Sequence, residues 1–160
     1  MEPDLKMHDL HCMVSGVMNT CQIYNAQGVL LRTLPAFPHG INGPSWKSWG
    51  GDTVPGLYRV TSYVPTEDPD LHGKIGASYG KGYFYLQEME GQEQRYNRAG
   101  EGWHGGGTGL ADPLADFQEL LATEGCVRSH NKDIQVLATV FHQVWALGGT
   151  VWFTVIQAES

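Results

Sequence analysis

The chain has 160 residues, of which 41% are hydrophobic, which is enough for one contiguous core but too few for two full domains. Ten basic and seventeen acidic side chains give a net charge of −7, and no lysine- or arginine-rich run offsets it. We therefore expect a single domain over residues 1–160 that binds neither a nucleic acid nor an anionic membrane surface. No stretch approaches the roughly 18 consecutive apolar residues of a transmembrane helix.

The first residues contain neither a basic segment nor an apolar run, so we expect no secretory signal peptide within these 160 residues. The cysteines are Cys12, Cys21 and Cys126, an odd number without C-x-x-C spacing. At least one thiol is therefore expected to be free within a monomer. A disulfide between Cys12 and Cys21 is left open.

Taken in chain order, the first half of the sequence predicts β-structure. Two apolar segments over residues 21–34 flank a turn at 25–28 and predict a hairpin. Residues 56–64 and 82–89 are rich in β-branched and aromatic side chains and predict two more strands. Residues 35–55, rich in proline, glycine and tryptophan, form either a long ordered loop or a surface feature.

The second half changes to helical spacing. Asp112 precedes a proline, as is typical of a helix N-terminus, and the apolar residues that follow predict a short helix over 113–122. From Asn131, apolar residues again recur three and four apart until Gly148, which predicts a longer helix packed on the sheet. Residues 150–157 predict a last buried strand, so the fold class is mainly β, of the α+β type.

A histidine and a cysteine in glycine-rich sequence carry the clearest chemistry. His104 precedes three glycines, and Cys126 follows Gly125, 22 positions after the histidine. A thiol with an ordinary pKa is mostly protonated at neutral pH, so it needs a nearby base such as imidazole before it attacks a carbonyl. Gly125 lets a substrate approach the backbone closely, and neighbouring amides can stabilise an oxyanion. The pair indicates nucleophilic catalysis.

The sequence around these residues resembles the catalytic domain of the L,D-transpeptidases, also called the YkuD domain. In that family a His-Gly element precedes Ser-His-Gly-Cys-hydrophobic-Arg, followed by Asn and Asp. This chain has His104-Gly105, then Thr-Glu-Gly-Cys-Val-Arg over 123–128, with Asn131 and Asp133 after it.

Weaker similarities extend the resemblance over residues 21–157, although it is strongest over 53–157. Residues 53–60 resemble the family's Thr-Pro-x-Gly-x-Phe segment, and 79–86 resemble the strand that leads to the histidine. The resemblance implies a YkuD-like β-sandwich with one or two helices packed on it.

The resemblance also implies roles for individual residues. Cys126 would be the nucleophile and His104 its base, with the Gly105 carbonyl holding the imidazole tautomer and the backbone of residues 124–126, including Gly125, forming an oxyanion hole. The residues expected to support the cysteine loop or to meet substrate are Arg128, Asn131, Glu124, Trp103 and Tyr83. No metal or cofactor is implied. The alternative, a zinc site, would draw on Cys126, His104, His130 and His142.

Two departures from the family pattern bear on activity. Glu124 stands where the family usually has histidine, and its charge is expected to raise the Cys126 pKa unless Arg128 neutralises it. The separation of His104 and Cys126 is also longer than is usual. The helix predicted over 113–122 would fill the difference as an inserted lid.

These features predict a cysteine-dependent L,D-transpeptidase, or an L,D-carboxypeptidase or endopeptidase, that acts on peptidoglycan stem peptides through a thioester. The alternative is a catalytically inactive YkuD-like domain that binds cell wall or is a structural component of a phage or injection particle. Either protein would act in the periplasm or cell wall. Without a signal peptide, we expect delivery by a phage, lysis or injection route, with partners from that apparatus, or origin from a truncated secreted precursor.

Overall fold

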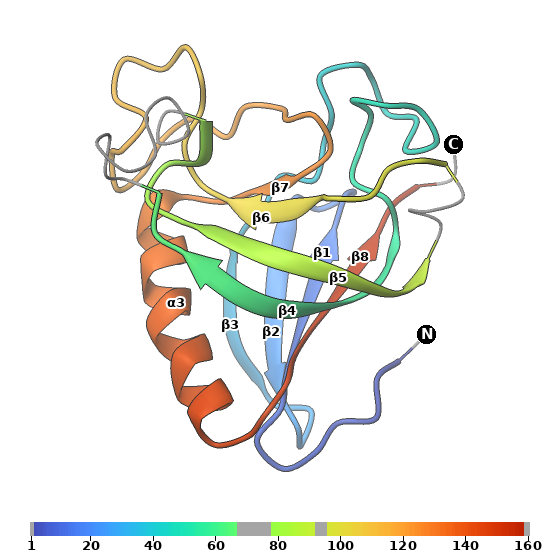
Figure 1. The fold of residues 1–160 in the computed structure, drawn as a ribbon, viewed down its shortest axis with the longest axis vertical. Helices are drawn as coiled ribbons and strands as arrows, with labels where there is room; N and C mark the ends of the chain where they lie inside the picture. The colour runs from blue at the N-terminus through green and yellow to red at the C-terminus, as the bar shows by residue number, and fades with distance from the viewer. Residues whose placement is uncertain (1, 67–77, 92–95, 159–160) are drawn as a thin grey trace.

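The computed structural model describes residues 2–66, 78–91 and 96–158. It contains an eight-stranded curled sheet of order β3-β2-β1-β8-β4-β5-β6-β7, with helix α3 packed against it (Figure 1). The elements are β1 (Leu10–Ser15), β2 (Thr20–Asn25), β3 (Leu30–Pro35), β4 (Gly56–Val64), β5 (Tyr83–Gly91), β6 (Gly102–His104), β7 (Val127–Arg128), α3 (Asn131–Ala146) and β8 (Val151–Ile156). The long loops gather beside β6 and β7, at the top of Figure 1.

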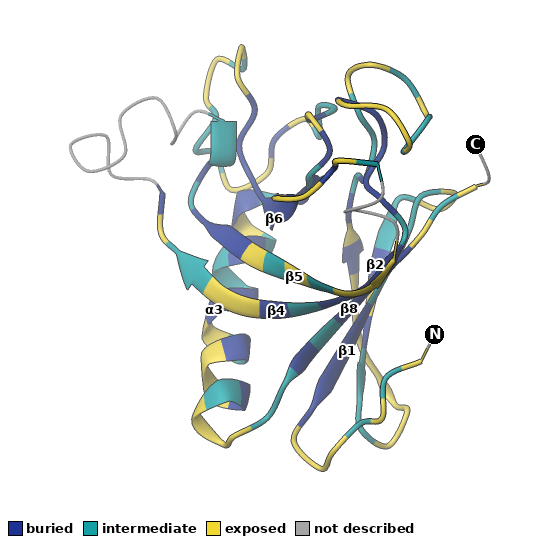
Figure 2. Ribbon diagram, turned by 45° about the vertical axis from the view of Figure 1, so that its right-hand side comes forward, coloured by how far each residue is buried: buried dark blue, intermediate teal, exposed yellow. Residues whose placement is uncertain are grey.

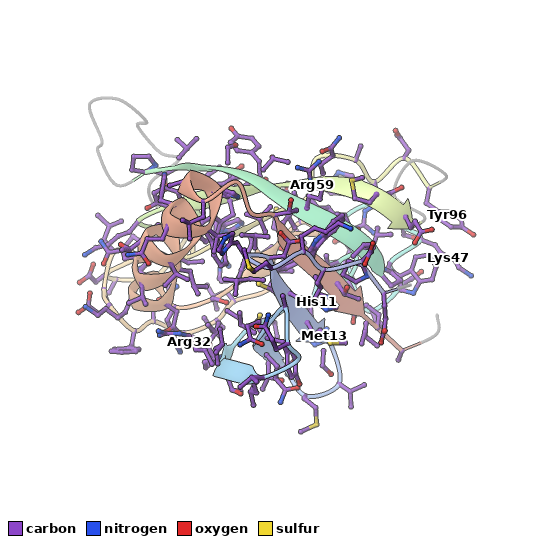
Figure 3. The ribbon with its side chains drawn as sticks, turned by 90° about the horizontal axis from the view of Figure 1, so that it is seen from below. His11, Met13, Arg32, Lys47, Arg59 and Tyr96 are labelled. Carbon is purple, nitrogen blue, oxygen red and sulfur yellow. The ribbon has the colours of Figure 1, made fainter. Side chains whose placement is uncertain are left out.

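Strands from the two ends of the chain form the centre of the sheet. β1 runs parallel to β8, with Leu10 opposite Val151, and β8 runs antiparallel to β4. On the face away from the core, His11 and Arg59 (both labelled in Figure 3) are paired in register with Trp152 from either side. The Arg59 guanidinium is 6.0 Å from the Trp152 ring. The sequence did not predict β1, because its polar and apolar residues mix without a clear period and its partner β8 is distant in the chain.

Helix α3 buries its apolar face against the sheet. Ile134, Leu137 and Phe141, three and four positions apart, are at most 1% exposed. The Phe141 ring lies 6.2 Å from that of Trp103, which lies 5.0 Å from Phe153 of β8. An aromatic core therefore holds helix and sheet together. In the described part of the chain, no helix is both long and apolar enough to cross a membrane.

Most of the predicted elements are confirmed. The hairpin is β2 and β3, the strand over 56–64 is β4, and the strand over 82–89 corresponds to β5. The long helix from Asn131 is α3, and the last strand is β8. The fold is mainly β with a packed helix, as predicted, and the two layers expected of a sandwich belong to one curled sheet.

The helix predicted over 113–122 is wrong, because this segment forms turns and irregular loop. The Asp112 carboxylate accepts a hydrogen bond from the Leu114 N–H (3.2 Å), as a helix N-cap would, but the Ala115 N–H donates to the Asp112 carbonyl (3.3 Å) and closes a turn that does not continue as a helix. Further along, the Gln118 N–H donates to the His130 ring (3.2 Å) instead of to a carbonyl of its own segment. Contacts with distant residues therefore override the helical spacing.

Residues 35–55 form an ordered loop that pairs with the loop around Cys126. The backbones of Phe37 and Arg128 exchange two hydrogen bonds (2.7 and 3.1 Å), and the Ile41 N–H donates to the Thr123 carbonyl (2.8 Å). This loop is therefore part of the scaffold of the candidate site.

Cys12 and Cys21 are free, fully buried thiols on the neighbouring strands β1 and β2, so the disulfide that was left open is not present. Burial raises the Cys12 pKa, and a hydrogen bond with Cys21 adds to the effect. Cys126 differs from both because it is partly exposed.

Candidate active site

Cys126 lies directly before β7 and faces the neighbouring strands β5 and β6. The Gly102 N–H, at the start of β6, donates to the Cys126 sulfur at 3.2 Å, and the Tyr83 hydroxyl lies 3.9 Å from the same sulfur. Tyr83 and His104 are paired residues of β5 and β6, and β6 is buried along its whole length (Figure 2). The antiparallel register of β5 and β6 therefore places the Tyr83 phenol beside the His104 imidazole, on the strands that face Cys126.

His104 is held in one orientation by its neighbours. Its ring is 2% exposed and stacks on Tyr83, with centroids 5.5 Å apart and an interplanar angle of 12°. Its Nδ1 lies 2.8 Å from the Gly105 carbonyl oxygen, which can only accept, so Nδ1 carries the proton. The predicted contact with Gly105 is thus present, and Nε2 is the nitrogen able to accept a proton.

Burial alters the protonation of both reactive groups. Enclosure raises the Cys126 pKa to about 11, and the hydrogen bond from Gly102 offsets this only in part, while the Glu101 carboxylate raises the pKa further. Burial, reinforced by the charge of Arg128, lowers the His104 pKa to about 3. At pH 7 the thiol and the imidazole are therefore both neutral. This state suits proton transfer from sulfur to a general base during attack, not a preformed thiolate–imidazolium pair.

Gly125 has a structural reason to be glycine. Its φ is +131°, and a Cβ there would lie 2.6 Å from the Arg98 guanidinium and 2.7 Å from the Glu101 carboxylate. Its N–H donates to the Thr123 hydroxyl (3.0 Å), which itself donates to the Cys126 carbonyl (2.7 Å). One of the predicted oxyanion donors, the Gly125 N–H, is thus already engaged in this structure.

The Arg98–Glu101 ion pair beneath Gly125 is buried and ties loops together. The two side chains meet at 2.7 Å and are 3% and 6% exposed. The pair anchors the loop that crosses it, because the Val54 N–H donates to Glu101 (3.0 Å). Arg98 also donates to the backbone carbonyls of Trp46, Ser48, Gly51 and Asp52.

Contacts between aromatic and basic side chains hold the same two segments together. The Trp46 ring lies 5.7 Å from that of Tyr96, and the Lys47 ammonium lies 6.0 Å from the Tyr96 ring (Figure 3). Sequence reasoning missed the Arg98–Glu101 pair. An arginine with an acid three positions later, Arg98 and Glu101, was the only signal in the sequence, and an exposed i,i+3 pair gives the same signal.

Arg128 is 5% exposed and binds backbone rather than carboxylates. Its guanidinium donates to the carbonyls of Gly105 (3.3 Å), Leu121 (2.9 Å), Ala122 (3.4 Å) and Ser78 (3.0 Å). No ion pair joins it to Glu124 within the described residues, and the Glu124 side chain is exposed. The alternative in which Arg128 neutralises Glu124 through an ion pair is therefore not the arrangement in this structure.

Asn131 is completely buried at the start of α3, where it joins three loops instead of meeting substrate. Its Oδ1 accepts from the Lys81 and Gly106 N–H groups, both at 3.1 Å. Its Nδ2 donates to the carbonyls of Pro113 (2.8 Å) and Ala115 (2.7 Å). It is a scaffold residue of the site.

Two cavities meet at Cys126. The lining of the larger, of about 570 Å³, includes Ser78, His104, Thr108, Leu121, Ala122 and Arg128. The lining of the smaller, of about 220 Å³, includes Trp49, Tyr83, Asn97, Arg98, Gly100 and Glu101. Tyr79, Glu124 and Cys126 line both. A group bound in either cavity can therefore reach the sulfur.

The structure brings most of the predicted site residues together, but Trp103, like Asn131, is buried away from the position expected for substrate. Trp103 was expected beside the substrate, but its side chain is completely buried in the core and its indole N–H donates to the Ser129 hydroxyl (2.9 Å). Neighbouring residues on a strand point to opposite faces, so the strand that turns Trp103 inward presents His104 to the cavity. Within the described residues, no group of three or more His, Cys, Asp or Glu side chains could hold a metal ion.

Comparisons of the sequence find no matching family model and no matching curated protein. Solved structures match the fold. The L,D-transpeptidase (Yku) from Stackebrandtia nassauensis is 14% identical with a TM-score of 0.54, covering 94% of this chain and 56% of that one. Bd1075 from Bdellovibrio bacteriovorus is 16% identical with a TM-score of 0.60, covering 96% of this chain and 48% of that one. The cell shape determining protein Pgp2 from Campylobacter jejuni is 13% identical with a TM-score of 0.59, covering 94% and 48%.

The molecule therefore has the fold of the YkuD-type L,D-transpeptidases, as its motifs predicted. The chain spans about half the length of these structural neighbours.

Proposed function

We propose that this protein is a cysteine-dependent acyltransferase or hydrolase of the L,D-transpeptidase type that acts on peptidoglycan stem peptides at the cell wall. The observation that carries the proposal is the position of Cys126. Its sulfur lies where two cavities meet, and His104, with Nε2 free to accept a proton, lines the larger one. The fold shared with the L,D-transpeptidase from Stackebrandtia nassauensis supports the same reading.

In the proposed reaction the stem peptide lies in the larger cavity. His104 Nε2 takes the thiol proton while the Cys126 sulfur attacks the carbonyl carbon that precedes the terminal D-residue. The carbon–nitrogen bond then breaks, the departing amine takes the proton from His104, and a thioester remains. Attack by water gives a shortened stem, and attack by an amine gives a crosslink.

The test is covalent trapping by a carbapenem, followed by intact-mass measurement. We expect one adduct on the wild type and none on Cys126→Ala, because the buried Cys12 and Cys21 are out of reach. Release of D-alanine from purified stem peptides by the wild type alone would extend the result to the natural bond. A wild type without an adduct, or an adduct that persists in Cys126→Ala, contradicts the proposal.

A second candidate is an inactive domain of this fold that binds cell wall. The observations that favour it are a thiol whose pKa is raised to about 11 and a Gly125 N–H already bound to Thr123. Such a domain would sediment with purified sacculi, leave their composition unchanged, and bind equally well as Cys126→Ala. Any D-alanine release by the wild type excludes it.

A further inference from the structure

The proposed base and nucleophile lie on two strands that pair over a short distance. His104 is the last residue of β6, and Cys126 directly precedes β7. In the described chain these strands run parallel and share only two residue pairs, followed by a hydrogen bond from the Ser129 N–H to the His104 carbonyl (3.0 Å). So short a parallel ladder gives little rigidity by itself. The position of His104 relative to Cys126 therefore depends on contacts beyond the strands.

The side chain of Gln118 joins the ends of these two strands. Its Nε2 donates to the carbonyls of Gly106 and Ser129, both at 3.2 Å, and its Oε1 accepts from the Asn131 N–H (3.1 Å). Gly106 comes two residues after the base, and Ser129 comes three residues after the nucleophile. The side chain is 9% exposed, and both its donors and its acceptor are used. It therefore braces the segment with the base against the segment with the nucleophile.

Gln118 lies in the segment that lengthens the chain between the base and the nucleophile. This segment is docked on the start of α3, because the Gln118 N–H donates to the His130 ring (3.2 Å) and the Lys132 N–H donates to the Asp116 carbonyl (2.9 Å). Gln118 lines neither of the two cavities. Any effect of its amide on catalysis therefore passes through the position of other residues and not through contact with substrate.

We propose that Gln118 is a positioning residue that fixes His104 relative to Cys126 for transfer of the thiol proton. The inference rests on the proposed function and deepens it, because it names a residue outside both cavities on which the chemical step depends. The amide forms no bond with the reactants. It restricts the relative motion of β6 and β7, so that the thiol and the accepting nitrogen meet. The longer separation of base and nucleophile thereby has a use.

The enclosure of the His104 ring depends on the same brace. The rings of Tyr79 and Tyr83 lie 4.6 and 5.5 Å from it, and the Arg128 guanidinium is the charged group that acts on it. Burial is the main reason that the His104 pKa is lowered to about 3. When the brace is removed and water reaches the ring, this pKa rises toward its ordinary value of 6.5. Titration of His104 therefore reports its enclosure without any catalysis.

The first experiment follows the histidine resonances by NMR between about pH 8 and pH 4. Gln118→Met keeps the length of the side chain and removes its three hydrogen bonds. Gln157→Met is the matched control, because Gln157 also donates to two backbone carbonyls, those of Pro38 (2.9 Å) and Thr53 (3.1 Å). We expect His104 to titrate in this range in Gln118→Met and not in the wild type or the control. No titration in Gln118→Met, or equal titration in the control, overturns the proposal.

The second experiment separates binding from chemistry during acylation by a carbapenem. We expect Gln118→Met to lower the first-order rate constant of acylation about tenfold. The carbapenem concentration that gives half of the maximal rate should change less than about twofold, because Gln118 lines neither cavity. An unchanged rate constant contradicts the positioning role, whether or not the half-maximal concentration changes.

A second variant keeps the proposal testable when Gln118→Met does not unfold cooperatively in urea. Gln118→Asn retains the amide but is one methylene shorter, so it cannot span the carbonyls of Gly106 and Ser129 together. We expect the same two effects at smaller size, and their absence overturns the proposal. A wild type without a carbapenem adduct defeats the proposed function, whereas the His104 titration still decides whether Gln118 holds the base in place.

Discussion

Arg98 and Arg128 occupy matching positions, one in the wall of each cavity next to Cys126. Both are buried, and each donates to four backbone carbonyls of the surrounding loops. They differ because Arg98 has Glu101 at 2.7 Å, whereas Arg128 has no ion-pair partner among the described residues. The same side chain therefore has two uses: Arg98 fastens loops without adding charge, and Arg128 fastens loops while lowering the His104 pKa.

Arg98→Met should cause the largest effect, because it leaves the Glu101 carboxylate buried without its partner. We expect a loss of about 3–5 kcal/mol in the free energy of unfolding. Urea denaturation measures it, with Arg32→Met on the exposed surface of β3 as the control. The double variant Arg98→Met/Glu101→Leu should recover part of the loss. A single variant as stable as the control would show that the pair is not a structural anchor.

Arg128→Met should cost less stability, about 2–3 kcal/mol, because it strands neutral carbonyls and no buried charge. It should also slow alkylation of Cys126 at pH 8, since the guanidinium opposes the rise in the thiol pKa. Arg128→Lys keeps the charge without the forked donors, so it should lose stability while thiol reactivity stays near that of the wild type. Equal thiol reactivity in Arg128→Met and Arg128→Lys would contradict the claim that the positive charge at position 128 lowers the Cys126 pKa.

Acid should destabilise the fold through His104. Its folded pKa is about 3, below the ordinary value of 6.5, so the unfolded chain binds a proton that the folded chain refuses. The contribution of His104 to the free energy of unfolding is therefore fully present above pH 6.5 and is lost as the pH drops toward 3. Denaturation measured across this range should show a shallower fall in His104→Gln, with the slope from the buried His11 left in place. Arg128→Met should also flatten the curve and Arg98→Met should not, which extends the contrast between the two arginines.

Glu101→Gln should produce the smallest change in thiol reactivity, and because it also leaves the buried Arg98 without its ion-pair partner, the thiol is measured under conditions in which the variant is folded. Loss of the carboxylate stabilises the thiolate, so the alkylation midpoint should fall below the wild-type value of about 11. Each unit of decrease gives about threefold faster alkylation at pH 8, because the gain in thiolate is partly offset by its lower nucleophilicity. The pH dependence of iodoacetamide alkylation reports the shift. An unchanged or raised midpoint would mean that Glu101 does not act on the sulfur.

Helix α3 and strands β2, β3, β4, β5 and β8 were predictable because their apolar patterns and glycine boundaries are local properties of the sequence, whereas β1, β6 and β7 were not predicted. The pairing of His104 with Cys126 in one cavity wall followed from motif order and glycine context. The predictions that were wrong, such as the helix over 113–122, failed because contacts with residues outside the segment determine its structure. Leu114 and Phe117 have helical spacing, yet Asp112 caps a turn and Gln118 bonds to His130.

The same limit applies to the candidate site. Sequence reasoning placed Glu124 against the sulfur, whereas Glu101 is the carboxylate that raises the Cys126 pKa. Trp103 faces the core because strand alternation gives the cavity face to His104. The assembled fold decides that Glu101 is buried while Glu124 is exposed. It also decides which face of the three-residue strand β6 turns toward the core.

The central pairing of β1 with β8 determines when the chain can fold. The sheet is joined across its middle by residues 10–15 and 151–156, so its two halves remain unconnected until the last strand is made. Folding must close a loop that spans nearly the whole chain, which favours slow folding with a high relative contact order. During synthesis, the half that carries β1 to β3 must wait on the ribosome for β8, and its unpaired edge is exposed to aggregation in that interval.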